Sequence, residues 1–263
     1  MRILLTVVGA IAVSVTTIGR AAGTYSPSPP ARHLVIAELF TSEGCSSCPP
    51  ADALLQQIAE QSPVEGVQVL GIEEHVDYWD HLGWRDRFSS AAFTRRQSDY
   101  AARVFRFGEV YTPQLVVDGA FEAVGSDGRR VRDAIARAAA LPAADVRIAA
   151  TQDGGRAHVR AAVDVPDTVR RRGDASVIVA VVEDALASRV DGGENRGRTL
   201  SHAAVARSLN AIGSLSERQS SGTVTGDVPL DPAWDLSRVR VVAFLQERGT
   251  LRVLGSAASP LTR

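Results

Sequence analysis

The sequence of 263 residues contains no lysine, two cysteines and one methionine. Without lysine the chain cannot form a Schiff base and cannot complete a phosphate-binding P-loop. The methionine is Met1, in a segment that we expect to be removed, so a copper site with a thioether ligand is excluded. After this segment no run approaches eighteen apolar residues, and we expect no later membrane-spanning helix.

Neither sign of charge dominates, because 29 basic residues stand against 30 acidic residues. This balance lacks the positive footprint of proteins that bind nucleic acid or acidic lipid, so we expect no nucleic-acid partner. Hydrophobic residues make up 45% of the chain, which is typical of a folded protein with a packed core.

Residues 1–22 have the pattern of a secretory signal peptide. An arginine precedes an uncharged apolar run from Ile3 to Val15, and small residues lie near the expected cleavage site. Residues 23–32 are rich in proline and serine and are interpreted as a linker. We therefore expect a periplasmic or secreted protein with no stable membrane span after processing.

Residues 33–142 alternate between strand and helix patterns. Apolar runs at 33–40, 67–73 and 111–119 are typical of buried strands, and 121–125 adds a hairpin partner to the third. Apolar residues at helical spacing predict helices after Pro49, after Ser89 or Ser90, and after Ser126 or Asp127. The fold class predicted here is α/β, with a mixed central sheet flanked by helices.

Residues 145–263 change in character. Seven short valine-rich runs are separated by glycine, aspartate and proline. Runs of this kind predict a smaller all-β domain, sandwich-like in architecture.

The cysteines lie in "FTSEGCSSCPP" at Cys45 and Cys48, between the first strand and the first helix. As a structural staple the pair is weak, since so small a loop contributes about 2 kcal/mol against nearly 5 for a loop of a hundred residues. As a zinc site it is incomplete, because a second pair of ligands is missing. Two-coordinate Cu(I) between the thiolates remains open.

A reactive pair fits this position better. A thiol just ahead of a helix lies near the positive end of the helix dipole, which favours the thiolate. We predict that Cys45 is the attacking sulfur and that Cys48 resolves the mixed disulfide.

One further stretch of polar residues could supply metal ligands. The stretch "EEHVDYWDHLGW" contains His75, Asp77, Asp80 and His81, but its spacing matches no helical histidine pair. We interpret it as a loop that packs over the active edge and whose carboxylates cap or pair to Arg85 and Arg87. Its aromatic residues, Tyr78, Trp79 and Trp84, are candidates for a wall beside the cysteines that receives a substrate. His202 stands alone in a strand pattern, which is usually structural. No metal and no cofactor are therefore predicted.

The order of a buried strand, a CxxC pair, a helix and a later strand headed by proline resembles the thioredoxin fold. By that resemblance the Thr112-Pro113 bond would be cis and would face the cysteines, leaving backbone free to pair with a substrate. Tyr111, Thr112, Pro113 and Trp79 are the residues expected to bind substrate. Glu38 resembles the acid that relays protons beneath the disulfide, although it stands one position too far from Cys45, which would turn it to the other face of the strand.

The chain also resembles a family of secreted proteins of unknown function that have a thioredoxin-like domain followed by a β domain. The matching stretches are "ELFTSEGCSSCPPAD", "HVDYWDHLGWRDRFSSAAFTRRQSDYA", "VYTPQLVVDG" and "GENRGRTLSHAAVARSL". The resemblance departs from thioredoxins proper at Gly44, where tryptophan is usual. It implies an architecture and leaves the activity open.

The function expected from the sequence is an extracytoplasmic thiol-disulfide oxidoreductase. Its partners would be a cysteine-containing protein or a small disulfide, together with a second redox protein, and the direction of electron flow is not readable from residues. Two alternatives remain: a binding or assembly module with an inert disulfide, and a Cu(I) carrier.

Overall fold

The computed structural model describes residues 33–106 and 108–263. The predicted signal peptide (1–22) and linker (23–32) lie outside the described residues.

Residues 33–142 form alternating strands and helices, as the sequence pattern predicts. The strands are β1 (His33–Thr41), β2 (Val67–His75), β3 (Gln114–Val117) and β4 (Phe121–Val124), and the helices are α1 (Pro49–Glu60), α2 (Ala91–Tyr100) and α3 (Gly128–Ala139). Ser90 caps α2 by accepting the Ala92 N–H, and Asp127 caps α3 by accepting the Arg130 N–H. A π-helical turn, η1 (Ala101–Phe105), extends α2.

Residues 145–263 form strands and one 3-10 turn. The elements are β5 (Asp145–Asp153), β6 (Arg156–Asp164), β7 (Ala175–Arg189), β8 (Thr199–Leu215), β9 (Ser221–Pro229), η2 (Leu236–Arg238), β10 (Val239–Glu247) and β11 (Val253–Pro260). At 15 and 17 residues, β7 and β8 are longer than the short runs that the sequence suggests. The reason is that bulges shift the register between them without ending the pairing.

The strands from the two halves of the chain share one sheet. Its order is β11-β10-β7-β8-β2-β1-β3-β4, while β5, β6 and β9 form a second sheet of three strands. The halves join where β8 runs parallel to β2, with Val205 opposite Glu73. The fold is therefore mixed α/β with a large mixed sheet, and the sequence boundary at 142–145 does not separate two sheets. By its contacts, Arg32–Arg263 is one compact unit.

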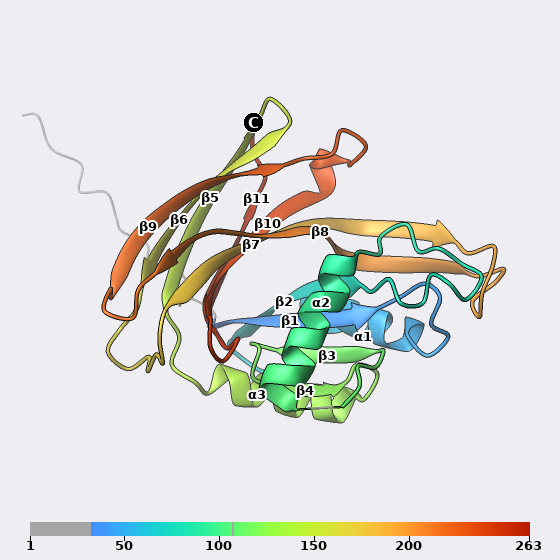
Figure 1. Cartoon of the computed structure of the whole chain (residues 1–263), viewed down its shortest axis with the longest axis horizontal. Helices are drawn as coiled ribbons and strands as arrows, with labels where there is room; N and C mark the ends of the chain where they lie inside the picture. The colour runs from blue at the N-terminus through green and yellow to red at the C-terminus, as the bar shows by residue number, and fades with distance from the viewer. Residues whose placement is uncertain (1–32, 107) are drawn as a thin grey trace, which may run out of the picture. The chain divides into compact units, whose positions relative to one another are not determined.

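The first strands are buried on both faces, as their near-continuous apolar composition predicts. On one face, Val35, Ala37 and Leu39 pack against α1 and α3. On the other face, Ile36 belongs to a cluster with Phe93 of α2. Figure 1 shows α2 crossing in front of β1 and β2. This alternation decides which side chains of β1 and β2 lie near the cysteines.

The second sheet covers the part of the large sheet formed by the C-terminal strands. Ala161 and Val163 of β6 share a core with Val177 of β7 and Leu245 of β10. In Figure 1, β5, β6 and β9 lie together at the upper left, beside β7, β10 and β11. This packing of two sheets gives the C-terminal half its sandwich-like character.

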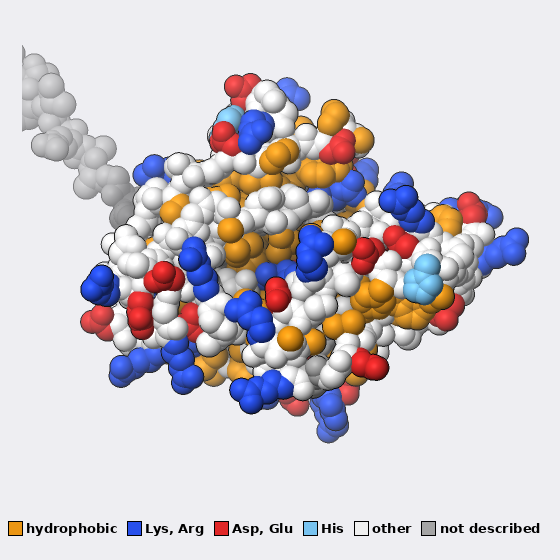
Figure 2. All heavy atoms as spheres, viewed as in Figure 1, with side chains coloured by type: hydrophobic (Ala, Val, Ile, Leu, Met, Phe, Trp, Pro, Cys, Tyr) orange, Lys and Arg blue, Asp and Glu red, His pale blue; other side chains and the backbone are white. Residues whose placement is uncertain are grey.

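The surface matches the balanced composition. On the face drawn in Figure 2, arginine and carboxylate side chains are interspersed. None of the helices in the described residues is long and apolar enough to cross a membrane.

Candidate functional site

Cys45 and Cys48 form a disulfide at the start of α1, with their Cα atoms 5.4 Å apart. Cys48 is the N-cap of the helix, and its carbonyl oxygen accepts the N–H groups of Ala51 and Asp52. The hydroxyl of Ser47 lies 3.3 Å from Cys45 Sγ. Both cysteines have 0% exposed surface, so the bond between them is covered.

Two loops provide cover around this turn. Trp79 lies against Gly44, where an added Cβ would be 3.2 Å from the tryptophan Cβ. From the segment between β7 and β8, the Asn195 amide donates to the carbonyl oxygens of Glu43 and Cys45, at 2.9 Å each. Glu194 of the same segment accepts the Ser46 N–H at 3.0 Å. We call residues 190–198 the cover segment.

Of the residues predicted to bind substrate, Trp79, Thr112 and Pro113 are linked to this turn or to α1, whereas Tyr111 contacts β4. The Thr112-Pro113 bond is cis, as the resemblance implied. Trp79 Nε1 donates to the Thr112 hydroxyl at 2.9 Å, which joins the tryptophan to the residue before the proline. Pro113 lies near Ala51 of α1, since an added Cβ on Gly125 would come within 3.4 Å of both. Tyr111 donates its hydroxyl to Glu122 of β4 at 2.6 Å, and burial raises its pKa.

Glu38 does not lie beneath the disulfide, so the proton-relay prediction is not supported. Its carboxylate pairs with Arg96 of α2 and accepts the Tyr100 hydroxyl at 2.7 Å. The physical reason is strand alternation: residues 35, 37 and 39 face α1, so residue 38 faces α2.

Asp52 is a buried acid on the cysteine side of the sheet. It lies on α1 one turn after Cys48, is 4% exposed, and accepts the Thr41 hydroxyl at 2.7 Å. Burial, followed by the nearby charge of Glu73, raises the pKa of Asp52 to about 7. Its only signal in the sequence is an acid among the small and apolar residues of the first turn of α1.

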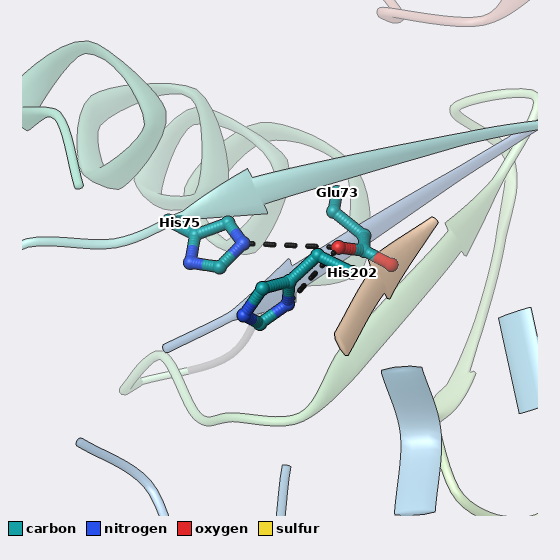
Figure 3. A group of neighbouring side chains, drawn as sticks. All are labelled: Glu73, His75 and His202. Atoms are coloured by element: carbon teal, nitrogen blue, oxygen red, sulfur yellow. Dashed lines mark ion pairs between the residues drawn. The ribbon is translucent and has the colours of Figure 1, made fainter. Parts of the chain in front are cut away.

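A second cluster consists of Glu73, His75 and His202, all buried. Figure 3 shows the imidazoles of His75, at the end of β2, and His202, in β8, beside the Glu73 carboxylate. Glu73 Oε2 lies 3.3 Å from His202 Nδ1 and 3.8 Å from His75 Nε2. These three atoms lie within 4.8 Å of one another, so the side chains could hold a metal ion.

The second ring nitrogen of each histidine in this cluster lies near another carboxylate. Asp86 Oδ2 lies 2.6 Å from His75 Nδ1, and Glu43 Oε1 lies 3.4 Å from His202 Nε2. Although burial opposes protonation, Asp86 raises the pKa of His75 to about 10, and Glu43 with Glu73 raises that of His202 to about 9. Glu43 stands two residues before Cys45, so the cluster adjoins the disulfide turn.

Within the loop of residues 76–90, a carboxylate accepts hydrogen bonds from the loop itself, as predicted from the sequence. Asp80 accepts the Asp86 N–H at 3.2 Å and the Ser89 hydroxyl at 2.7 Å. The sequence indicated His75 and His202 separately, and their meeting depends on the pairing of β2 with β8, which no local pattern indicates.

Two solved structures resemble this chain over most of its length. Protein AGR_C_4864 from Agrobacterium tumefaciens is 25% identical, with a TM-score of 0.64 over 87% of this chain and 94% of that one. HBP35 of Porphyromonas gingivalis is 14% identical, with a TM-score of 0.67 over 88% of this chain and 76% of that one. The second similarity concerns the fold alone. Curated protein sequences gave no match.

The family comparison agrees with the resemblance noted in the sequence. A model described as "Protein of unknown function (DUF1223)" matches residues 36–246, a span that includes the disulfide, the cover segment and the Glu73, His75 and His202 cluster. The chain therefore belongs to the DUF1223 family.

Proposed function

We propose that this protein is a thiol-disulfide oxidoreductase that works outside the cytoplasm through Cys45 and Cys48, on a thioredoxin-like arrangement of residues 33–142. One observation carries the proposal: the two cysteines of the chain are bonded to each other across a single turn at the start of α1. There the helix dipole favours a thiolate in the reduced state. The N-terminal sequence supports the location.

The exchange reaction balances within the pair and its substrate. In the oxidising direction, a substrate thiolate attacks Cys45 Sγ, the bond to Cys48 breaks, and Cys48 leaves as a thiolate that takes up a proton. A second substrate thiol then attacks the mixed disulfide and releases Cys45 as a thiol. The substrate loses two electrons and two protons, and the protein gains both. The reducing direction is the reverse.

Burial of the disulfide sets a condition on this chemistry. Because both cysteines have no exposed surface, an incoming thiolate reaches Cys45 only after neighbouring residues move, and in this proposal those residues are the cover segment and Trp79. The substrate would then lie along the edge formed by Trp79, Tyr111, Thr112 and Pro113. In this proposal the cover segment limits access to the disulfide.

The same burial favours a second candidate function. A disulfide that is permanently covered is inert, and the protein would then be a binding or assembly module. Structural disulfides have reduction potentials below about −300 mV, whereas catalytic pairs lie between about −270 and −120 mV.

One experiment distinguishes the oxidoreductase from the inert module. The purified protein is equilibrated in glutathione buffers and alkylated, and the reduced fraction is measured by mass spectrometry. The proposal expects a potential in the catalytic range and turnover of a disulfide substrate. A potential below about −300 mV without turnover would establish the inert module.

Trapping gives a matched pair of variants. Cys48→Ser retains the attacking thiol and should capture a mixed disulfide, while Cys45→Ser should not. Equal capture by both would contradict the assigned roles. Titration of Cu(I) into the reduced protein tests the copper-carrier alternative, which requires stoichiometric binding that either cysteine variant abolishes.

A further inference from the structure

We infer that Glu73, His75 and His202 form a binding site for one divalent transition-metal ion of the zinc class, separate from the cysteines. The ligand atoms are His75 Nε2, His202 Nδ1 and Glu73 Oε2. Two imidazoles and a carboxylate are a ligand set that zinc uses in proteins.

The distances suit a single ion. Tetrahedral zinc with bonds of about 2.0–2.2 Å separates neighbouring ligand atoms by about 3.3–3.6 Å. The two distances from Glu73 Oε2 are 3.3 and 3.8 Å, and the third pair lies within 4.8 Å. Small rotations of the two rings therefore bring all three atoms to bonding distance. Figure 3 shows both rings on one side of the carboxylate.

The surrounding residues are those that orient histidine ligands at metal sites. A metal-binding histidine almost always donates its other ring N–H to a carboxylate or carbonyl oxygen, which fixes the ring and its tautomer. Asp86 stands in this position for His75 and is held by the Glu43 and Phe88 N–H groups. Glu43 faces the far nitrogen of His202 and is held by Trp84 Nε1 at 2.8 Å.

A second observation concerns hydrogen bonds. In the described part of the chain, His75 Nε2, His202 Nδ1 and Glu73 Oε2 have no hydrogen-bond partner, although all three are buried, and the neighbouring His202 Nε2 and Glu43 Oε1 have none either. Buried polar atoms without a partner are uncommon in folded proteins and costly when they occur. That three such atoms converge on one point is the feature that indicates a ligand.

Two protonated imidazoles are the competing arrangement. The net charge of this arrangement equals that of the metal-bound site, because one divalent ion replaces two protons. The ring centroids are 4.8 Å apart, so two positive rings would repel each other, and the nitrogens that face Glu73 lie 3.3 and 3.8 Å from its Oε2 without good hydrogen-bond geometry. Against this repulsion, each ring lies between two carboxylates that favour its protonated form. One ion accepts all three lone pairs at once.

The site would join the two halves of the large sheet. In the described chain, the ladder between β2 and β8 consists of the pair Glu73 and Val205, supported by the Ala203 N–H donating to Glu73 Oε1. Ligands from both strands would strengthen this junction.

The test is zinc binding to the full chain after treatment with a chelator and dialysis, measured by calorimetry and elemental analysis. We expect one zinc ion per chain, with affinity about 10- to 100-fold lower in Asp86→Asn and a larger loss in His202→Asn. The matched control is His158→Asn, which changes an exposed histidine of β6 and should bind as the wild type does. No stoichiometric zinc in the wild type, or unchanged binding in a folded His202→Asn, would overturn the inference.

Two measurements do not depend on the folding of His202→Asn. The visible spectrum of the wild-type protein with Co²⁺ should show tetrahedral nitrogen and oxygen ligands, and thiolate charge-transfer bands would contradict the site. The variant lacking both cysteines should still bind one zinc ion. Loss of zinc in that folded variant would overturn the inference, whereas failure of the redox experiments would leave it unaffected.

Discussion

The side-chain amide of Asn195 donates to the carbonyl oxygen of Cys45 at 2.9 Å, although the residues stand 150 positions apart. The same nitrogen donates to the Glu43 carbonyl oxygen, so one side chain ties the cover segment to both ends of the turn before the disulfide. We therefore expect Asn195 to affect both access to the disulfide and the stability of this junction.

Asn195→Ala should expose the disulfide and destabilise the protein. Two carbonyl oxygens lose a buried donor, which costs about 1–3 kcal/mol of the free energy of unfolding. We expect faster reduction by dithiothreitol, followed by alkylation and mass spectrometry, and a lower urea midpoint. Glu194→Ala is the matched control, because its bond to Ser46 is exposed. An equal effect of both substitutions would refute the role given to Asn195.

The ion pair between Glu38 and Arg96 should be important for stability. Arg96 lies against Glu38, Glu74 and the Tyr100 hydroxyl, and both carboxylates are buried. Arg96→Met leaves these acids without their cation, and loss of one partner of a buried pair costs about 3–5 kcal/mol. Urea denaturation should show this loss.

Two further variants test that interpretation. Glu38→Gln added to Arg96→Met should recover part of the lost stability, because one uncompensated charge is removed. Arg95→Met changes the exposed neighbour on α2 and should alter the free energy of unfolding by less than about 0.5 kcal/mol. No recovery in the double variant would contradict a charge-based explanation.

The sequence predicted the elements around the disulfide because each has a strong local cause. The apolar run at 33–40 is typical of a strand buried on both faces, and Pro49 suits the first turn of a helix. The alternation of β1 even indicated that Glu38 faces away from the cysteines.

The join between the halves and the second cluster could not be predicted in the same way. β8 meets β2 at Val205 and Glu73, and this pairing has no periodic signal because it depends on where distant strands pack. His202 therefore looked solitary in the sequence. The bond from Asn195 to the Cys45 carbonyl oxygen has the same origin, since the cover segment comes from the far half of the chain.

Gly119 should tolerate no side chain. Its φ is +63°, and an added Cβ would lie 2.0 Å from the Leu251 carbonyl oxygen. Gly119→Ala therefore combines an unfavourable backbone conformation with a clash against backbone, and we expect a loss of about 2 kcal/mol or more in the free energy of unfolding. Gly154→Ala is the control, since its φ of +54° is similar but the space is open. Its cost should be about 1 kcal/mol, from the backbone alone.

Asp118 should make stability depend on pH. Burial, with a smaller contribution from Glu38, raises its pKa from the ordinary 3.8 to about 7. Between about pH 4 and pH 7 the folded state therefore binds a proton that the unfolded state lacks. The free energy of unfolding falls as pH rises through this window, by at most about 1.4 kcal/mol per pH unit from this group, and the effect levels off above pH 7.

Asp118→Asn removes this titration while preserving the structure. The amide oxygen can still accept the Ile36 N–H, which Asp118 Oδ1 accepts at 2.8 Å, and asparagine tolerates the φ of +46°. We expect the variant to gain stability relative to the wild type from pH 4 to pH 7, and the difference to stay constant above pH 7. Urea denaturation at each pH from 4 to 8 measures it. The opposite result would be a difference in the free energy of unfolding between variant and wild type that does not change from pH 4 to pH 7. It would show that the Asp118 carboxyl group is ionised in the folded protein throughout this range, because folded and unfolded wild-type protein then bind the same number of protons at this group.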